Sequence, residues 1–209
     1  MSVPKSVSEA FRDEQQELST AALGMWIFLA SEVLFFGSAL LAFALMRIYY
    51  PVGFAEASTH LGVWWGTANT VILLVSSALV ALSEHASEDG RGGLFGRSLL
   101  GALGLASVFL GIKGYEYWQK FQHHHVPGEG FAQGDFAEPA AAEMFFMIYF
   151  ALTGLHAVHV IGGIGWMVAL LFVARRAQVR HVSVQTFALY WHFVDIVWIF
   201  LFPLLYLIA

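Results

Sequence analysis

Five long apolar runs decide what this chain can fold into. They cover about residues 21–46, 61–83, 97–119, 140–174 and 183–208. At about 1.5 Å per helical residue, each run can cross the roughly 30 Å hydrocarbon core of a bilayer. Backbone polar groups in that core must be satisfied within the segment, which a helix does. The sequence therefore predicts an all-α, polytopic membrane protein in which five transmembrane helices form one membrane domain.

Composition supports this class and excludes several functions. Of the 209 residues, 58% are hydrophobic and only 12% are charged, which is far from the range of soluble globular proteins. The chain has no cysteine, so disulfides, thiolate metal sites and a cysteine nucleophile are excluded. Ten Lys and Arg spread over the whole chain form no basic patch, so we expect no nucleic-acid partner.

The N-terminal segment and the basic residues predict an orientation. Residues 1–20 are polar and of mixed charge, without the apolar run of a secretory signal, so we expect a polar cytoplasmic tail. Five spans place seven basic residues on the N-terminal side of the membrane and two on the other. The seven are Lys5, Arg12, Arg91, Arg97, Arg175, Arg176 and Arg180, and the two are Arg47 and Lys120. The excess predicts a cytoplasmic N-terminus and a periplasmic or extracytoplasmic C-terminus.

The connections between spans are predicted from turn residues. Tyr50 to Gly53 breaks the first span from the second, and residues 84–93 form a charged, glycine-rich turn. The longest loop begins at the triplet His123-His124-His125, which we expect to be solvated because adjacent residues rarely converge on one metal ion. Pro203 is expected to kink the last turns of the fifth span.

Glu32 lies near the middle of the first span, where a carboxyl group is easily held protonated. Two interpretations stay open. In the functional interpretation, Glu32 is part of a proton relay or accepts a hydrogen bond from a lipid or backbone donor. In the structural interpretation, Glu32 is a neutral acid that forms a hydrogen bond with a neighbouring helix.

His156 and His159 are three residues apart in the fourth span, so both imidazoles are expected on one helix face. That spacing suits a metal or a haem iron, although a haem would need His192 or another helix to supply the opposite ligand. The favoured alternative is hydrogen bonding between helices that approach closely at small residues. The small residues of this span are Gly154, Gly162, Gly163 and Gly165.

Two further polar groups lie in the spans. His192 and Asp195 share a face of the fifth span, as a proton-transfer pair or, as we favour, a donor–acceptor pair that locks the helix to its neighbours. Lys113, Glu116 and Lys120 follow one face of the third span, where they can pair with each other near the helix end.

Together these motifs resemble subunit III of the haem–copper respiratory oxidases, the cytochrome c oxidase subunit 3 family. The matching stretches are MWIFLASEVLFF at 25–36, KGYEY at 113–117, LTGLHAVHV at 152–160 and YWHFVDIVWIFLF at 190–202. The similarity covers about residues 21–209 in the right order, and the last motif is the most specific. The chain resembles the short, five-helix form of the family.

The resemblance implies a subunit without catalytic or metal residues of its own. Haem and copper are then expected on partner subunits I and II, and phospholipid in a V-shaped cleft. By resemblance, Glu32 matches the family's carbodiimide-reactive glutamate. We expect Glu32, His156 and His159 to support lipid binding or proton uptake. Lys113, Glu116, His192 and Asp195 are then expected to form a structural polar network.

The main hypothesis is a non-redox subunit of a proton-translocating terminal oxidase, a cytochrome c oxidase, in a bacterial inner membrane. It would pack on subunit I, with a small subunit IV and a respiratory supercomplex as further partners. Within the family, subunit III of a quinol oxidase and a nitric oxide reductase accessory protein remain alternatives. Outside it, the alternatives are a small membrane cytochrome with His156, His159 and His192 as ligands, and a proton-coupled transporter using Glu32 and Asp195.

Overall fold

The computed structural model describes residues 14–176 and 179–208, and all regular structure in these ranges is helical. The long helices are α1 (Glu14–Tyr49), α3 (Val63–Glu88), α4 (Gly92–Gln122), α5 (Pro139–Arg176) and α6 (His181–Tyr206). Two short elements connect them, α2 (Pro51–Thr59) after α1 and the 3-10 helix η1 (Gln133–Asp135) between α4 and α5. Most of the predicted polar tail, residues 1–13, lies outside the described residues.

The five long helices confirm the predicted all-α, five-span fold. Among the described residues, each of these helices is long and apolar enough to cross a membrane, so the chain is a multi-pass membrane protein. Most helix ends extend beyond the predicted spans. α1 begins at Glu14 rather than near residue 21, and α4 begins at Gly92 rather than near residue 97. Hydropathy locates only the apolar part of a helix, and polar turns continue past it.

The predicted glycine-rich turn at 84–93 is much shorter in the structure. α3 continues to Glu88, and Gly90 adopts φ +70°, a left-handed conformation that glycine accepts without strain. The Gly90 N–H donates to the Ser87 carbonyl and the Arg91 N–H to the Ala86 carbonyl. These two bonds form a Schellman motif, which ends α3 and lets α4 begin after only three intervening residues.

The break predicted at Tyr50–Gly53 contains the start of a short helix, α2, that was not predicted from the sequence. Pro51 occupies the first turn of α2, where its missing N–H costs no hydrogen bond. Phe54 and Ala57 of α2 are fully buried, and α2 packs against α5. The break in hydropathy is therefore a short packed helix rather than an open loop.

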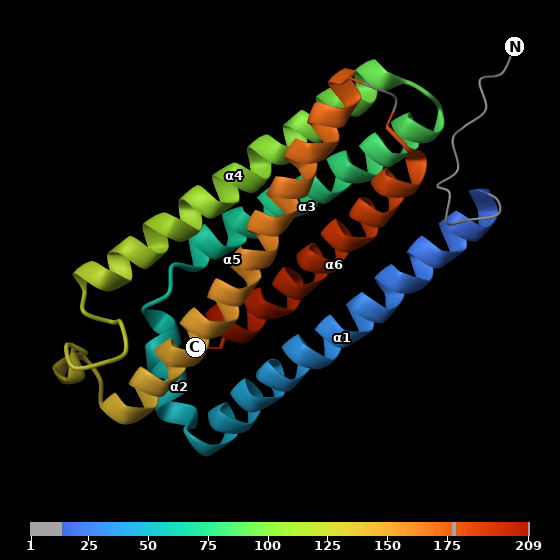
Figure 1. Ribbon diagram of the computed structural model, residues 1–209. Helices are drawn as coiled ribbons and strands as arrows, with labels where there is room; N and C mark the ends of the chain where they lie inside the picture. Colours follow the sequence, from blue (N-terminus) through green and yellow to red (C-terminus); the bar gives the residue numbers. More distant parts are fainter. Residues whose placement is uncertain (1–13, 177–178, 209) are drawn as a thin grey trace, which may run out of the picture.

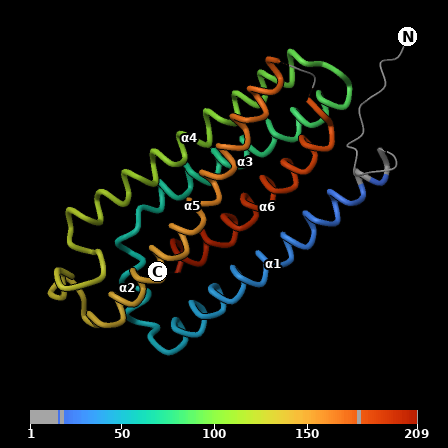
Figure 2. The backbone as a smooth tube through the Cα atoms, viewed as in Figure 1, coloured from blue at the N-terminus to red at the C-terminus, as the bar shows by residue number. Residues whose placement is uncertain are grey.

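α6 lies centrally in the bundle, where it contacts α1, α3 and α5 (Figure 1). α3 and α4 form an antiparallel hairpin, and α4 packs in turn against α5. The backbone trace shows α1 set apart along one side, next to α6 (Figure 2). Of the most apolar window of each helix, 56% is buried in α6 but only 17% in α1. Lipid or a partner protein must therefore cover most of α1.

A cluster of aromatic side chains fills the core at the end of the bundle near α2. Phe43, Phe54 and Phe145 pack with ring centroids 5.5–6.0 Å apart and are fully buried. These rings come from α1, α2 and α5, so the cluster fixes α2 between two spans. Further along the core, Trp191 and Trp198 are the largest buried side chains of α6.

The predicted close approach at small residues occurs at Gly163. A Cβ atom there would collide with the Trp191 ring, whose Cε3 would lie 2.7 Å away. Gly162 is less tight, with the Tyr190 hydroxyl 3.4 Å from such an atom, and Gly165 has nothing within 4 Å. Among the small residues of α5, Gly163 therefore sets how closely α6 can pack.

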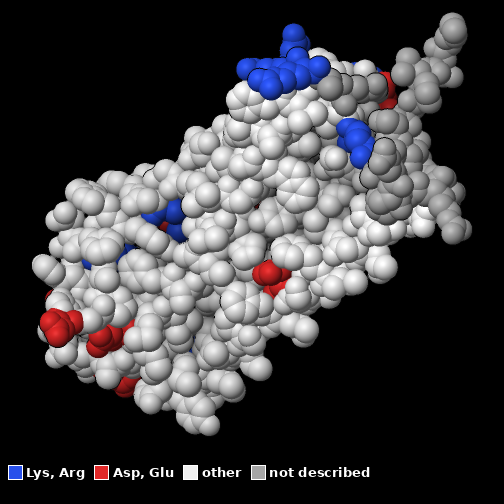
Figure 3. Space-filling view, in the orientation of Figure 1, with Lys and Arg blue, Asp and Glu red and all other residues white. Residues whose placement is uncertain are grey.

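The two ends of the molecule differ in the charge of their side chains (Figure 3). The end where α3 turns into α4 and α5 into α6, here called the basic end, carries Arg91, Arg97, Arg175, Arg176 and Arg180, which outnumber the acids Glu84, Glu88 and Asp89 of the same end. The other end, here called the acidic end, carries Glu56, Glu129, Asp135, Glu138 and Glu143. Several of these acids cap backbone groups there. Glu138 accepts from the Gly53 N–H, Glu143 from the Gly128 N–H, and Glu56 from the Ala137 N–H.

Candidate functional site

Glu32 and His159 meet between α1 and α5 in the middle of the spans. His159 Nε2 lies 3.2 Å from Glu32 Oε2, and the two side chains are 15% and 17% exposed. His159 Nδ1 lies 2.9 Å from the Leu155 carbonyl oxygen, which can only accept, so Nδ1 carries a hydrogen. Nε2 therefore faces the carboxyl group. Glu32 and His159 form either an imidazolium–carboxylate pair or a neutral pair in which Glu32 holds the proton.

Aromatic rings surround this pair. Phe36 packs edge-on against the His159 ring at 5.3 Å, and Tyr190 stacks on it at 6.5 Å. The Tyr190 hydroxyl donates to the His159 carbonyl at 2.8 Å, which ties α6 to the same turn of α5. The contact between Glu32 and His159 is close but is not aligned as a hydrogen bond. A proton can thus be shared here after a small rotation of either side chain.

His156 does not join His159, contrary to the expectation of a shared face. Its ring packs between Phe109 of α4, at 5.6 Å, and Trp198 of α6, at 5.2 Å. His156 is 1% exposed, and neither ring nitrogen has a hydrogen-bond partner among the described residues. Positions three apart on a helix differ by about 60° in direction, which here is enough to aim the two rings at different helices.

Lys113 and Glu116 form the predicted pair, and two tyrosines complete it. Lys113 Nζ donates to Glu116 Oε2 at 3.0 Å, to Tyr149 Oη at 3.1 Å and to Tyr206 Oη at 2.8 Å. Tyr206 in turn donates to Glu116 Oε1 at 3.1 Å. All three donors of the ammonium group are used, and Lys113 and Glu116 are 4% and 2% exposed. This cluster, here called the Lys113 cluster, joins α4, α5 and α6.

Lys120 extends this polar line toward the acidic end. Its ammonium group donates to the carbonyl of His60, between α2 and α3, and its side chain is 7% exposed. The Tyr117 and Thr153 hydroxyls lie 2.6 Å apart and join α4 to α5 beside it. The three predicted residues of α4 therefore bond neighbouring helices and loops, rather than only each other.

His192 does not pair with Asp195 as predicted. His192 Nδ1 instead lies 2.6 Å from the Ser77 hydroxyl of α3. Asp195 is 3% exposed, and neither of its carboxyl oxygens makes a hydrogen bond to a described residue. Spacing along α6 indicates a common face but not which neighbour lies opposite, and α3 presents a serine there. The lock between α6 and α3 is therefore His192 with Ser77.

The histidine triplet is only partly solvated. His123 and His124 are exposed, whereas His125 is 4% exposed. The His125 ring stacks on Phe146 at 5.3 Å and packs against Phe136 at 5.2 Å. Its Nε2 lies 3.3 Å from Asp135 Oδ2. His125 therefore anchors the loop that contains η1 to the first turns of α5.

The end of α4 determines which histidine is buried. His124 adopts φ +54°, and the N–H of His125 donates to the Lys120 carbonyl in a Schellman arrangement. A residue other than glycine is uncommon in that conformation. The turn directs the chain so that His125 points inward. Burial lowers the pKa of His125 from its usual value of 6.5, and His60 and Lys120 lower it further, against the raising effect of Asp135.

The loop is expected to loosen in acid. Because the pKa of His125 is lowered in the anchored loop, the anchored loop binds a proton at His125 less readily than the open loop does. The anchoring is therefore complete above pH 6.5 and is lost as the pH falls below that value. Hydrogen-exchange protection of the Phe131 and Ala132 amides should fall in the same range. His125→Phe, which keeps an aromatic ring, should remove this pH dependence. His60, whose pKa burial also lowers, requires a parallel His60→Gln variant. An unchanged profile in His125→Phe would contradict the assignment.

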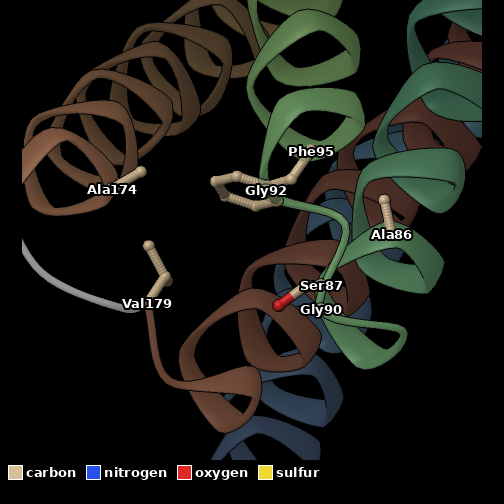
Figure 4. A pocket seen from close by; sticks show the side chains of 7 residues that line it. All are labelled: Ala86, Ser87, Gly90, Gly92, Phe95, Ala174 and Val179. Atoms are coloured by element: carbon tan, nitrogen blue, oxygen red, sulfur yellow. The ribbon is translucent and has the colours of Figure 1, made fainter.

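A cavity of about 190 Å³ lies at the basic end, between the ends of α3, α4, α5 and α6 (Figure 4). It is lined by Ala86, Ser87, Gly90, Gly92, Phe95, Ala174 and Val179. None of the predicted site residues contributes to this lining. Within residues 14–176 and 179–208, no group of three or more His, Asp or Glu is placed to hold a metal ion.

The hydroxyl partners of this polar network were not predicted from the sequence. Tyr149, Tyr206 and Ser77 complete contacts whose other members were foreseen. Tyr206 lies on the same face of α6 as Trp198, eight residues before it, and both approach Lys113. That periodicity was a usable signal for Tyr206, whereas Ser77 is one of many serines in apolar spans.

The fold and the buried polar contacts define a helical membrane protein whose polar side chains mainly join its own helices. A family model described as cytochrome c oxidase subunit III matches residues 15–209. The chain belongs to that family.

Individual relatives agree with this membership. The chain is 33% identical over 194 residues to cytochrome c oxidase subunit 3 of Thermostichus vulcanus, covering 90% of this chain and 87% of the relative. It is 31% identical over 201 residues to the Rhizopus stolonifer protein of the same name, covering 88% of this chain but 63% of the relative. It is 28% identical over 193 residues to cytochrome bo(3) ubiquinol oxidase subunit 3 of Pseudomonas aeruginosa, covering 89% and 84%.

Proposed function

We propose that this chain is the non-redox subunit III of a proton-translocating haem–copper oxidase, and that the oxidase is a cytochrome c oxidase. The family match over residues 15–209 carries this proposal. Haem and copper would reside on subunits I and II. The largely uncovered α1 supports a role in packing against a partner and lipid, because only 17% of its most apolar window is buried within the chain. A small subunit IV and a supercomplex remain further partners to test.

The proposed membrane is the bacterial inner membrane, with the basic end in the cytoplasm. The arginines that gather at that end support this orientation, since cytoplasmic loops carry an excess of Lys and Arg. The His125 loop and α2 would then face the periplasm or the outside. Labelling from outside intact cells should modify a cysteine introduced at the exposed Glu129, but not one introduced at the exposed Glu88.

Glu32 and His159 are proposed to support proton uptake by the oxidase and the binding of phospholipid in a cleft beside α1. Their partial exposure, at 17% and 15%, leaves them accessible to a neighbouring molecule, and their 3.2 Å contact can hold one proton. His156 is fully enclosed by this chain, which argues for a packing role instead.

Glu32→Gln is expected to assemble normally but to lose activity or proton pumping severalfold faster during turnover, because the shared proton is lost. The measurement is oxygen consumption and proton release by reconstituted complex over many turnovers. His159→Gln should behave alike, since it removes the other half of the pair. Glu129→Gln, in the exposed loop, is the matched control. A Glu32→Gln complex as durable as the parent would rule out this role.

A quinol oxidase is the second candidate, because the Pseudomonas aeruginosa relative carries that name at similar coverage. The electron donor, cytochrome c or ubiquinol, is expected to bind a partner subunit. Purified complex assayed with reduced cytochrome c and with ubiquinol separates the two, and turnover with cytochrome c is the expected result. The small-cytochrome alternative gains no support from geometry, because His156, His159 and His192 contact different neighbours. An isolated chain that shows a haem Soret band would revive it.

A further inference from the structure

Asp195 stands out among the buried polar groups. Its side chain is 3% exposed in the middle of α6, and neither carboxyl oxygen makes a hydrogen bond to a described residue. The two buried lysines of the bundle are engaged elsewhere, Lys113 by Glu116 and two tyrosines and Lys120 by the His60 carbonyl. An ionised carboxylate without a counter-charge inside a membrane span is strongly unfavourable, so the neutral acid is the state that this environment selects.

A polar route leads from Asp195 to the outside of the bundle. The Ser77 hydroxyl lies beside the Asp195 carboxyl and is 2.6 Å from His192 Nδ1. His192 is half-buried and lies four residues before Ile196, which is 50% exposed, so it is on the outward face of α6. Three side chains from two helices thus run from the core to the surface.

We infer that Asp195 holds a proton inside the bundle and that Ser77 and His192 conduct this proton to the outer face of α6. This inference does not rest on the oxidase assignment, and it is separate from the Glu32–His159 pair, which joins α1 to α5.

The hydrogens can be placed consistently along this route. A rotation of the protonated Asp195 carboxyl aligns its O–H with the nearby Ser77 oxygen, while the Ser77 O–H donates to His192 Nδ1, which leaves Nε2–H pointing outward. Transfer breaks the Asp195 O–H bond and forms a new Ser77 O–H bond, while the original Ser77 hydrogen moves to Nδ1. The products are a carboxylate and an imidazolium, and the Nε2 proton passes to an acceptor, a water molecule or a side chain, held where a partner protein covers this face of α6. The reverse sequence reloads Asp195.

Infrared spectroscopy of the complete chain, purified with its partners, tests whether Asp195 holds the proton. The parent should show the carbonyl band of a protonated carboxylic acid that shifts when aspartate is isotopically labelled, and Asp195→Asn should abolish it. Glu32→Gln should leave this band in place. Absence of a labelled band from the parent, or its persistence in Asp195→Asn, would overturn the inference.

The route is tested by the rate at which the Asp195 carboxyl proton exchanges for deuterium, followed as a shift of the same infrared band. Ser77→Ala should slow exchange by about tenfold or more, because one link in the hydrogen-bonded chain is removed. Ser77→Thr keeps a hydroxyl and should restore the parent rate. Ser76→Ala removes the adjacent buried hydroxyl, which contacts the Ala102 carbonyl instead, and should exchange like the parent. Equal rates in Ser77→Ala and the parent would overturn the route, even if Asp195→Asn fails to assemble.

Discussion

Lys113→Met is expected to be the most destabilising single substitution in the polar network. Methionine fills a similar volume but leaves Glu116, 2% exposed, without its cation. Removing one partner of a buried ion pair costs about 3–5 kcal/mol, because the remaining charge stays desolvated. The Tyr149 hydroxyl also loses the donor that joins α5 to α4, and Tyr206 keeps only its hydrogen bond to Glu116. Thermal unfolding of the purified protein in mild detergent, followed by tryptophan fluorescence, measures the loss.

Two variants make this result specific to the pair. The double variant Lys113→Met with Glu116→Gln should recover much of the lost stability, since no unpaired charge remains. Arg97→Met removes an exposed cation from the same helix and should change stability by about 0.5 kcal/mol or less. If Lys113→Met unfolds at the parent temperature, the Lys113 cluster does not hold the three helices together.

Gly163→Ala is expected to destabilise the contact between α5 and α6 by about 1–3 kcal/mol, the usual cost of overpacking a core. The new methyl group would collide with the Trp191 ring, which is fully buried and cannot move aside easily. The same unfolding assay detects the effect. Assembly into the complex should weaken too, because α6 is central to the bundle.

The matched control lies two residues away on the same helix. Gly165→Ala meets nothing within 4 Å and should be neutral or slightly stabilising, since alanine favours the helix. Trp191→Phe removes the part of the ring that the methyl group meets. Combined with Gly163→Ala, it should therefore lose less than the sum of the two single changes. Equal losses in Gly163→Ala and Gly165→Ala would contradict the close approach.

The spans could be predicted because apolar runs of that length, with so few charges, have few alternatives in water or lipid. The helix ends could not be predicted as well, since α3 continues through the charged residues Glu84 to Glu88. α2 was missed because nine residues give no span-length signal and its helix depends on packing against α5. Long-range packing, rather than local composition, decided these elements.

Site prediction succeeded where partners lie along one helix, as with Lys113 and Glu116. It failed for His192, because spacing cannot reveal that Ser77 of α3 lies opposite. It also failed for His125, whose burial depends on the left-handed turn at His124, a position where glycine would have been the readable signal. The contact of Glu32 with His159 joins α1 to α5, and only the fold brings them together.

This chain is proposed to support a larger oxidase without any electron passing through its own side chains. Purification through an affinity tag on this chain in mild detergent tests it most directly, with haem and copper quantified on each separated subunit. Larger subunits are expected to co-purify and to carry all the haem and copper. Haem or copper bound by this polypeptide itself, or a chain that purifies alone from gently solubilised membranes, would contradict it.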